Sequence, residues 1–190
     1  IFVGGICHEL GHALGLPHNC QRQDEQALWG TALMGSGNFT YGQEIREEGK
    51  GSFLTLAHSM KLAVHPGFSG SIKQMRQGPR RAVKDLKIEL YQENTAVRIT
   101  GDIDSDIPVH AVLVYLDPEG NSDYNATTHV AVPAIDGTFT IDCDSFVGSK
   151  GEIRLVYVHT NGWSAWNRDV MWPYTRTGDG VLTIGPKVNK

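Results

Sequence analysis

The chain has 190 residues, of which 40% are hydrophobic and 20% are charged, which is enough apolar material for one or two folded domains. Its 17 lysines and arginines against 21 aspartates and glutamates give a net charge of −4, which argues against a nucleic-acid-binding surface. It has no run of about 18 or more apolar residues, so we expect no membrane-spanning helix.

The first predicted element is a helix that carries the sequence HELGHALGLPH at residues 8–18. His8 and His12 are four residues apart, so about 40° separates them around a helix axis and both rings point from one face. Gly15 and Pro17 predict the end of the helix, because glycine adopts the left-handed conformation of a C-terminal cap and proline has no amide hydrogen. His18 then returns to the same side and completes a set of three imidazoles with an open fourth position, as is typical of catalytic zinc.

Glu9 is predicted to be the general base of this site. It is rotated by about 100° from His8, so its carboxylate lies beside the metal without ligating it. Zinc lowers the pKa of a bound water to about 7 and polarises a carbonyl group, which permits attack on a peptide bond at neutral pH. A chance match on an ordinary helix is disfavoured because the glycine and the third histidine are also in phase. Gly11 is expected to leave room for a passing backbone.

The pattern HExxHxxGxxH at residues 8–18 resembles that of the metzincin zinc metallopeptidases. The resemblance implies a zinc-dependent endopeptidase with a methionine turn beneath the metal. Residues 31–37 match that turn, so Met34 would underlie the imidazoles without ligating zinc; an ordinary core methionine is the alternative. Gly35 and Ser36 follow it where some metzincins have a tyrosine ligand, so no such ligand is expected.

The resemblance also has consequences for the whole protein. It implies that the N-terminal part of the catalytic domain precedes Ile1, and that this chain alone has little or no activity. It further implies a secreted, periplasmic or cell-surface protein.

Downstream of the methionine, residues 52–64 predict a helix with Ser52 as its N-cap and Pro66 after its end. In the loop before it, Phe39 and Tyr41 are expected to contribute to the wall of the substrate pocket.

Three cysteines are present. Cys7 and Cys20 flank the histidine motif, and they either form a disulfide that braces it or remain free thiols; the sequence leaves both alternatives open. Cys143 lies in an alternating segment and is predicted to be a core residue.

The second half of the chain follows the period-two pattern of strands. Gly, Ser, Gln, Pro and Arg dominate residues 67–81, which we interpret as a linker. The predicted strands are residues 86–91, 96–100, 109–116, 128–133, 137–142, 152–159, 164–171 and 180–184. The sequence therefore predicts an α+β chain: the C-terminal, mainly helical part of a metzincin catalytic domain at residues 1–66, then the linker, then an all-β immunoglobulin-like sandwich domain at residues 82–190.

Two clusters in the second half resemble ligand sites. The first is acidic and alternates like a calcium loop, but it lacks the glycine and terminal glutamate of an EF-hand, so a solvated turn is favoured over calcium. It consists of Asp102, Asp104 and Asp106. The second is aromatic and would either stack on a glycan or a protein partner or belong to the core. It consists of Trp163, Trp166, Trp172 and Tyr174.

Two functions follow from these features. One is a zinc-dependent endopeptidase with a protein or peptide substrate. The alternative is a glycan- or protein-binding module of a secreted protein whose truncated peptidase half is inactive. Retention of all three histidines and Glu9 favours the enzyme, because drift would remove at least one of them. Zinc in a purely structural role would leave Glu9 without a function.

Overall fold

The structure is a computed structural model that describes residues 3–70, 74–75, 77–118, 124–166 and 168–189. Of these residues, 38% lie in strands and 19% in helices. The expected α+β class, with a mainly helical peptidase part and a separate all-β domain, is therefore wrong. The chain is mostly β, and one of its helices, at residues 56–63, packs directly against a sheet.

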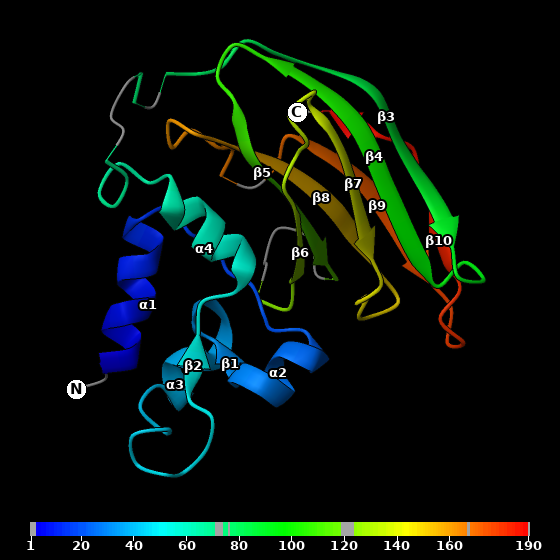
Figure 1. Cartoon of the computed structure of the whole chain (residues 1–190). Coiled ribbons are helices and arrows are strands. Elements are labelled where there is room, and N and C mark those ends of the chain that lie inside the picture. Colours follow the sequence, from blue (N-terminus) through cyan, green and yellow to red (C-terminus); the bar gives the residue numbers. More distant parts are fainter. Residues whose placement is uncertain (1–2, 71–73, 76, 119–123, 167, 190) are drawn as a thin grey trace.

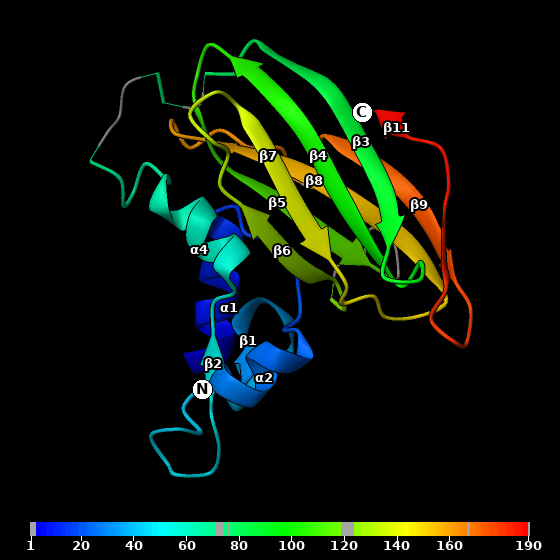
Figure 2. The same cartoon turned by 45° about the vertical axis from the view of Figure 1, so that its right-hand side comes forward.

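Two antiparallel sheets make up most of the chain. Over the described residues, the larger sheet has the spatial order β10–β9–β8–β5–β6 with β11 paired to β9, and the smaller sheet has the order β3–β4–β7. Figures 1 and 2 show the two sheets as facing layers. Their strands are β3 (Arg81–Tyr91), β4 (Ala96–Ser105), β5 (Val109–Asp117), β6 (Thr127–Ala131), β7 (Thr138–Cys143), β8 (Lys150–His159), β9 (Val170–Arg176), β10 (Leu182–Ile184) and β11 (Val188–Asn189).

The main core lies between these sheets. Val112 and Val114 of β5 point into it and meet Ile99 of β4 and Ile141 of β7. Alternate residues of a strand face opposite sides of the sheet, so each strand contributes every second side chain. Removing these apolar side chains from water is the main force that holds the layers together. Cys143 belongs to the same core, as the sequence predicts.

One predicted strand is displaced. Residues 164–171 were expected to form it, but β9 spans Val170–Arg176 and Ser164 forms only an isolated bridge to Val158. β9 contains Pro173, a residue that strand interiors usually exclude. The carbonyl oxygen of Pro173 accepts a bond from the Gly185 amide, and the nitrogen and oxygen of one strand residue face the same side. The missing amide of Pro173 therefore falls in the gap between β10 and β11, where no ladder bond needs it.

The N-terminal part holds short elements in close succession. They are α1 (Val3–Ala13), α2 (Gln23–Trp29), β1 (Thr31–Ala32), the π-helical turn η1 (Leu33–Gly37), α3 (Asn38–Thr40), β2 (Ser52–Phe53) and α4 (Leu56–Ala63). The helix predicted at residues 52–64 therefore begins later than expected, with Thr55 in the capping position. Ser52 is instead paired with Thr31 in a short parallel ladder, a partner that local propensity could not reveal.

Helix α4 joins the N-terminal part to the larger sheet. Ala57 and Val64 of α4 form a second apolar cluster with Leu113 and Tyr115 of β5 and Val156 of β8. Both faces of β5 and β8 are therefore covered, which explains their nearly continuous apolar sequences. Figure 1 shows α4 lying between α1 and this sheet.

The predicted linker at residues 67–81 is only partly described. Residues 71–73 and 76 lie outside the described residues, and β3 begins at Arg81. No described helix is long and apolar enough to cross a membrane.

Candidate metal centre

Helix α1 carries the first two candidate ligands and ends as the sequence predicts. Gly15 has a φ of 83°, in the left-handed region. The Gly15 amide donates to the His12 carbonyl (2.9 Å) and the Leu16 amide donates to the Gly11 carbonyl (3.0 Å). This pair of bonds is the Schellman cap, which satisfies the carbonyls of the last helical turn and reverses the chain. The reversal returns His18 toward His12.

The three histidines of the motif converge through one nitrogen each. His12 Nε2 lies 3.1 Å from His8 Nε2 and 3.0 Å from His18 Nε2. Tetrahedral zinc with Zn–N bonds of about 2.0–2.1 Å holds its nitrogens about 3.3 Å apart, so the observed spacing fits such an ion. Among the described residues, no other group of three His, Cys, Asp or Glu side chains converges in this way.

Backbone carbonyls fix the tautomers of two of these rings. His8 Nδ1 donates to the Leu33 carbonyl (2.8 Å), and His12 Nδ1 donates to the Leu16 carbonyl (2.9 Å). A carbonyl oxygen only accepts, so Nδ1 carries a proton and Nε2 is the nitrogen left to bind a metal ion. Two lone pairs 3.1 Å apart repel each other unless a cation or proton lies between them. The three nitrogens therefore suit a divalent metal ion. The two carbonyls would not ligate this ion; they orient two of the rings that would.

The methionine turn lies directly beneath α1. Met34 is fully buried, and a Cβ built on Gly11 would lie 2.3 Å from its Sδ. The expectation that a passing backbone requires Gly11 is wrong, because the methionine side chain occupies that space. The same turn supplies the Leu33 carbonyl that orients His8.

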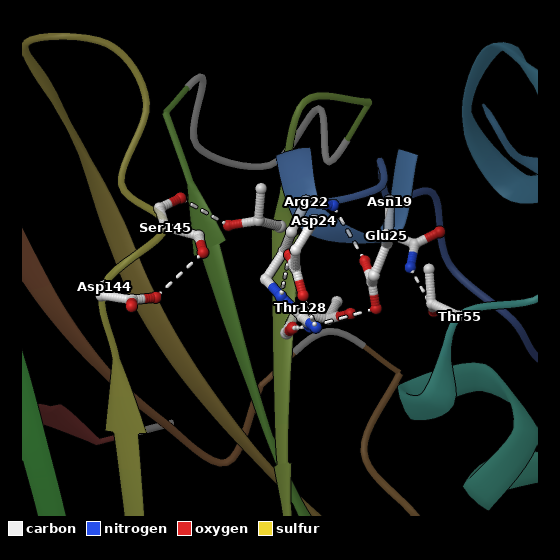
Figure 3. A network of polar contacts seen from close by, with 9 residues as sticks. Asn19, Arg22, Asp24, Glu25, Thr55, Thr128, Asp144 and Ser145 are labelled. Carbon is white, nitrogen blue, oxygen red and sulfur yellow. Dashed lines mark hydrogen bonds and ion pairs between the residues drawn. The ribbon is translucent and has the colours of Figure 1, made fainter. Parts of the chain in front are cut away.

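The segment after the third histidine is fastened to α4 and to the larger sheet. Asn19 Nδ2 donates to Thr55 Oγ1 (2.6 Å), and both residues are fully buried. Arg22 donates to the Thr128 carbonyl of β6 (2.8 Å). Figure 3 shows these contacts side by side, with the chain of the N-terminal part facing β6. The position of the third imidazole therefore depends on a strand more than a hundred residues away in sequence.

Sequence reasoning missed Tyr124. Its ring stacks on His18, with the ring centroids 3.6 Å apart and the planes inclined by 26°. Tyr124 is 48% exposed, so much of the ring remains open to solvent next to the candidate ligand. No local pattern marks this residue, because only the fold brings Tyr124, shortly before β6, next to His18.

Glu9 follows His8 on α1, and its side chain is exposed. Among the described residues, no hydrogen bond or ion pair engages its carboxylate. Phe39 and Tyr41, the expected pocket-wall residues, are 68% and 39% exposed.

The structure distinguishes between the alternatives for the cysteines and between those for the acidic cluster. Cys7 and Cys20 are free thiols, so the alternative without a disulfide holds. Asp106 is paired with Arg80 (3.0 Å). Within the described part of the chain, the alternating aspartates form no converging group of ligand atoms.

The aromatic cluster divides into two pairs. Trp172 and Tyr174 are 3% and 2% exposed and belong to the core between the sheets. Trp163 is half-buried and Trp166 is 53% exposed. Only this second pair is available to a ligand.

Comparisons with known proteins give a match among solved structures. No family model matches the chain, and no curated protein matches it. Wild-type OgpA from Akkermansia muciniphila is similar at 29% sequence identity with a TM-score of 0.78, over 96% of this chain and 51% of that chain. Catalytically inactive OgpA in complex with an O-glycopeptide substrate, glycodrosocin, is similar at 28% identity with a TM-score of 0.75, over 98% and 51% of the two chains.

The chain thus spans about half the length of the OgpA structures that it matches. The match extends over nearly all of this chain. The likeness supports a peptidase-related role at the level of the family.

Proposed function

We propose that this chain forms the metal-binding part of a metzincin-type zinc endopeptidase that cleaves O-glycosylated peptides. The observation that carries the proposal is the convergence of three Nε2 atoms, two of them on rings whose Nδ1 proton is held by a backbone carbonyl. The likeness to OgpA, whose inactive form was captured with an O-glycopeptide substrate, supports the choice of substrate.

His8, His12 and His18 would hold the ion through Nε2. When bound, zinc acidifies a water molecule and polarises the carbonyl of the scissile peptide bond. Glu9 takes a proton from the attacking water and returns it to the nitrogen of the leaving amine. The Leu33 and Leu16 carbonyls keep two imidazoles in the neutral tautomer that this role requires. Met34 would support helix α1 from below. The protein would act outside the cell.

The alternative function is a binding module with an inactive peptidase half. It is favoured only by the half-buried Trp163 and the exposed Trp166, which are compatible with an enzyme as well. The intact donor set and the unpaired Glu9 support catalysis instead.

The test uses the intact protein, an O-glycopeptide and the same peptide without its sugar. We expect cleavage of the glycopeptide in preference to the bare peptide, and loss of cleavage after chelation. The Glu9→Gln variant should keep its zinc while kcat/KM falls by about 10²- to 10⁴-fold, the usual share of a general base. Glu89→Gln, an exposed glutamate of β3, is the matched control and should behave as wild type. Full activity in Glu9→Gln, or cleavage that survives chelation, would contradict the proposal.

A further inference from the structure

A cavity of about 410 Å³ lies between the end of α1, helix α4 and the segment that follows β8. Its size is within the range of about 300–1,000 Å³ that is typical of small-molecule sites. None of the three candidate zinc ligands lines it. Its lining includes Leu14, Gly15, Lys61, His65, Trp163 and Trp166.

Lys61 brings a charge to this cavity without an internal partner. It is 8% exposed, and the described residues offer its amine no hydrogen bond or ion pair. Asp169 attracts it electrostatically, but the carboxylate oxygens of Asp169 already accept bonds from Arg81 (2.7 Å) and from the Tyr157 amide (2.9 Å). A buried ammonium group that lacks a partner costs free energy, which an anionic ligand would recover.

The charge of Lys61 persists near neutral pH. Burial lowers the pKa of its amine to about 8, and the attraction of Asp169 opposes part of that change. At pH 7 the amine is therefore still mostly protonated and able to pair with an anion.

The other wall of the cavity is aromatic and is held in place by hydrogen bonds. The Trp163 amide donates to Asn161 Oδ1 (3.1 Å), and the Trp163 carbonyl accepts a bond from the His159 amide (2.8 Å). Asn161 Nδ2 in turn donates to the Gln74 carbonyl (2.7 Å). Trp166, which follows closely, is 53% exposed. Indole faces of this kind cover the apolar face of a sugar ring, whose charged substituent then pairs with a nearby cation.

We infer that this cavity binds an anionic sugar, a saccharide ring that carries a carboxylate or a sulfate group, from the glycan of the substrate. The assignment to a substrate glycan rests on the proposed function. In this arrangement the Lys61 ammonium pairs with the anion, and the exposed indole of Trp166 covers the ring. The site lies beside the cap of α1 and is distinct from the metal centre.

The test is calorimetric titration of the intact protein with three probes: 3′-sialyllactose, 3′-sulfated lactose and lactose. We expect binding of at least one charged probe and at least 10-fold weaker binding of lactose. Lys61→Met, which keeps the apolar stem of the side chain, should weaken binding of the charged probe by about 10- to 100-fold, the usual loss for a hydrogen bond to a charged group. Trp166→Ala should weaken binding of the same probe by about 3- to 10-fold. Lys87→Met and Trp29→Ala, at exposed positions outside the cavity, are the controls.

The outcomes separate this inference from the proposed function. Binding must survive removal of zinc by chelation, since the metal ligands do not line the cavity. A preference between the two charged probes identifies carboxylate or sulfate as the natural group. Equal binding of lactose, no binding of either charged probe, or charged-probe binding that Lys61→Met and Trp166→Ala leave intact would overturn the inference, while zinc-dependent cleavage would stand. Because Trp166 is exposed, its variant keeps the test valid even if Lys61→Met does not fold.

Discussion

Tyr124 shows how a single residue of the β-rich part reaches the metal centre. Its ring lies against His18, the proposed ligand that comes from the loop rather than from α1. A loop residue has more freedom than a helical one, and aromatic stacking restrains the imidazole plane. We therefore propose Tyr124 as a positioning residue for the third proposed ligand.

Replacement of Tyr124 tests this role. We expect Tyr124→Ala to weaken zinc affinity by about 2- to 12-fold, because aromatic pairs contribute about 0.5–1.5 kcal/mol beyond their burial. Tyr124→Phe should keep the stacking and bind zinc like the wild type. Competition with a chelator of known affinity measures both. Loss of affinity in the phenylalanine variant would assign the effect to the hydroxyl group and contradict the stacking account.

His58 is a buried histidine whose burial makes the free energy of unfolding depend on pH. It is fully buried on α4, and neither ring nitrogen has a hydrogen-bond partner among the described residues. Burial, with smaller contributions from Lys61, His12 and His18, lowers the pKa of His58 to about 3. The unfolded chain takes up this proton near pH 6.5 and the folded chain does not. The associated stability is therefore complete above about pH 6.5 and declines as the pH falls toward 3.

His58→Leu removes this pH dependence. Between pH 7 and pH 4 the free energy of unfolding of the wild type should fall by about 3 kcal/mol more than that of the variant. At pH 7 the variant should be at least as stable, because it removes an unsatisfied buried polar group. Urea unfolding at both pH values, with a chelator present so that metal release does not contribute, gives the comparison. Parallel acid dependence in the two proteins would contradict the assignment.

At the scale of elements, α1 and the turn η1 are fitted to each other. The absent side chain of Gly11 leaves the space that the Met34 thioether fills, and the adjacent Leu33 carbonyl orients His8. The helix and the turn therefore act as one support for the ligands. A substitution in either element should therefore affect the packing of the other.

Gly11→Ala should destabilise the protein by about 1–3 kcal/mol through overpacking against the methionine. In the double variant with Met34→Ala, the added methyl group occupies vacated space, so the combined loss should be smaller than the sum of the single losses. Gly178→Ala, where a Cβ would meet nothing within 4 Å, is the control and should be nearly neutral. Denaturant unfolding of the four proteins completes the cycle, and strictly additive losses would contradict a contact between these residues.

At the scale of the whole molecule, helix α4 and the larger sheet share a core. Ala57 is buried where α4 meets β5 and β8, and Thr55 just before it holds Asn19 beside the third ligand. If the histidines bind zinc as proposed, packing on the sheet and metal binding are therefore linked through α4.

Ala57→Glu should disrupt the packing of α4 on the larger sheet. A charge without a partner at the buried position should cost several kcal/mol and lower both the thermal midpoint and the zinc affinity. Ala63→Glu, at an exposed position of the same helix, should leave both nearly unchanged. Calorimetry should show one transition for the wild type. Two transitions, only one of which responds to Ala57→Glu, would show that the two parts unfold independently.

The residues that sequence reasoning found and those it missed differ in a physical respect. The spacing of His8 and His12 and the cap at Gly15 are properties of one helix, so the local pattern suffices to predict them. The stacking of Tyr124 on His18 and the pairing of Ser52 with Thr31 depend on contacts between distant segments. The separate-domain prediction failed for the same reason, because the apolar face of α4 does not reveal that a sheet covers it.

The most direct test of the account is the metal content of the purified intact protein, measured by plasma mass spectrometry after dialysis against metal-free buffer. We predict one zinc ion per chain in the wild type and in His110→Ala, a histidine of β5 away from the centre. We predict almost none in His12→Ala, because His12 Nε2 is within 3.1 Å of both other ligand nitrogens. Zinc at full content in His12→Ala, or a wild-type protein that retains none, would contradict the central claim.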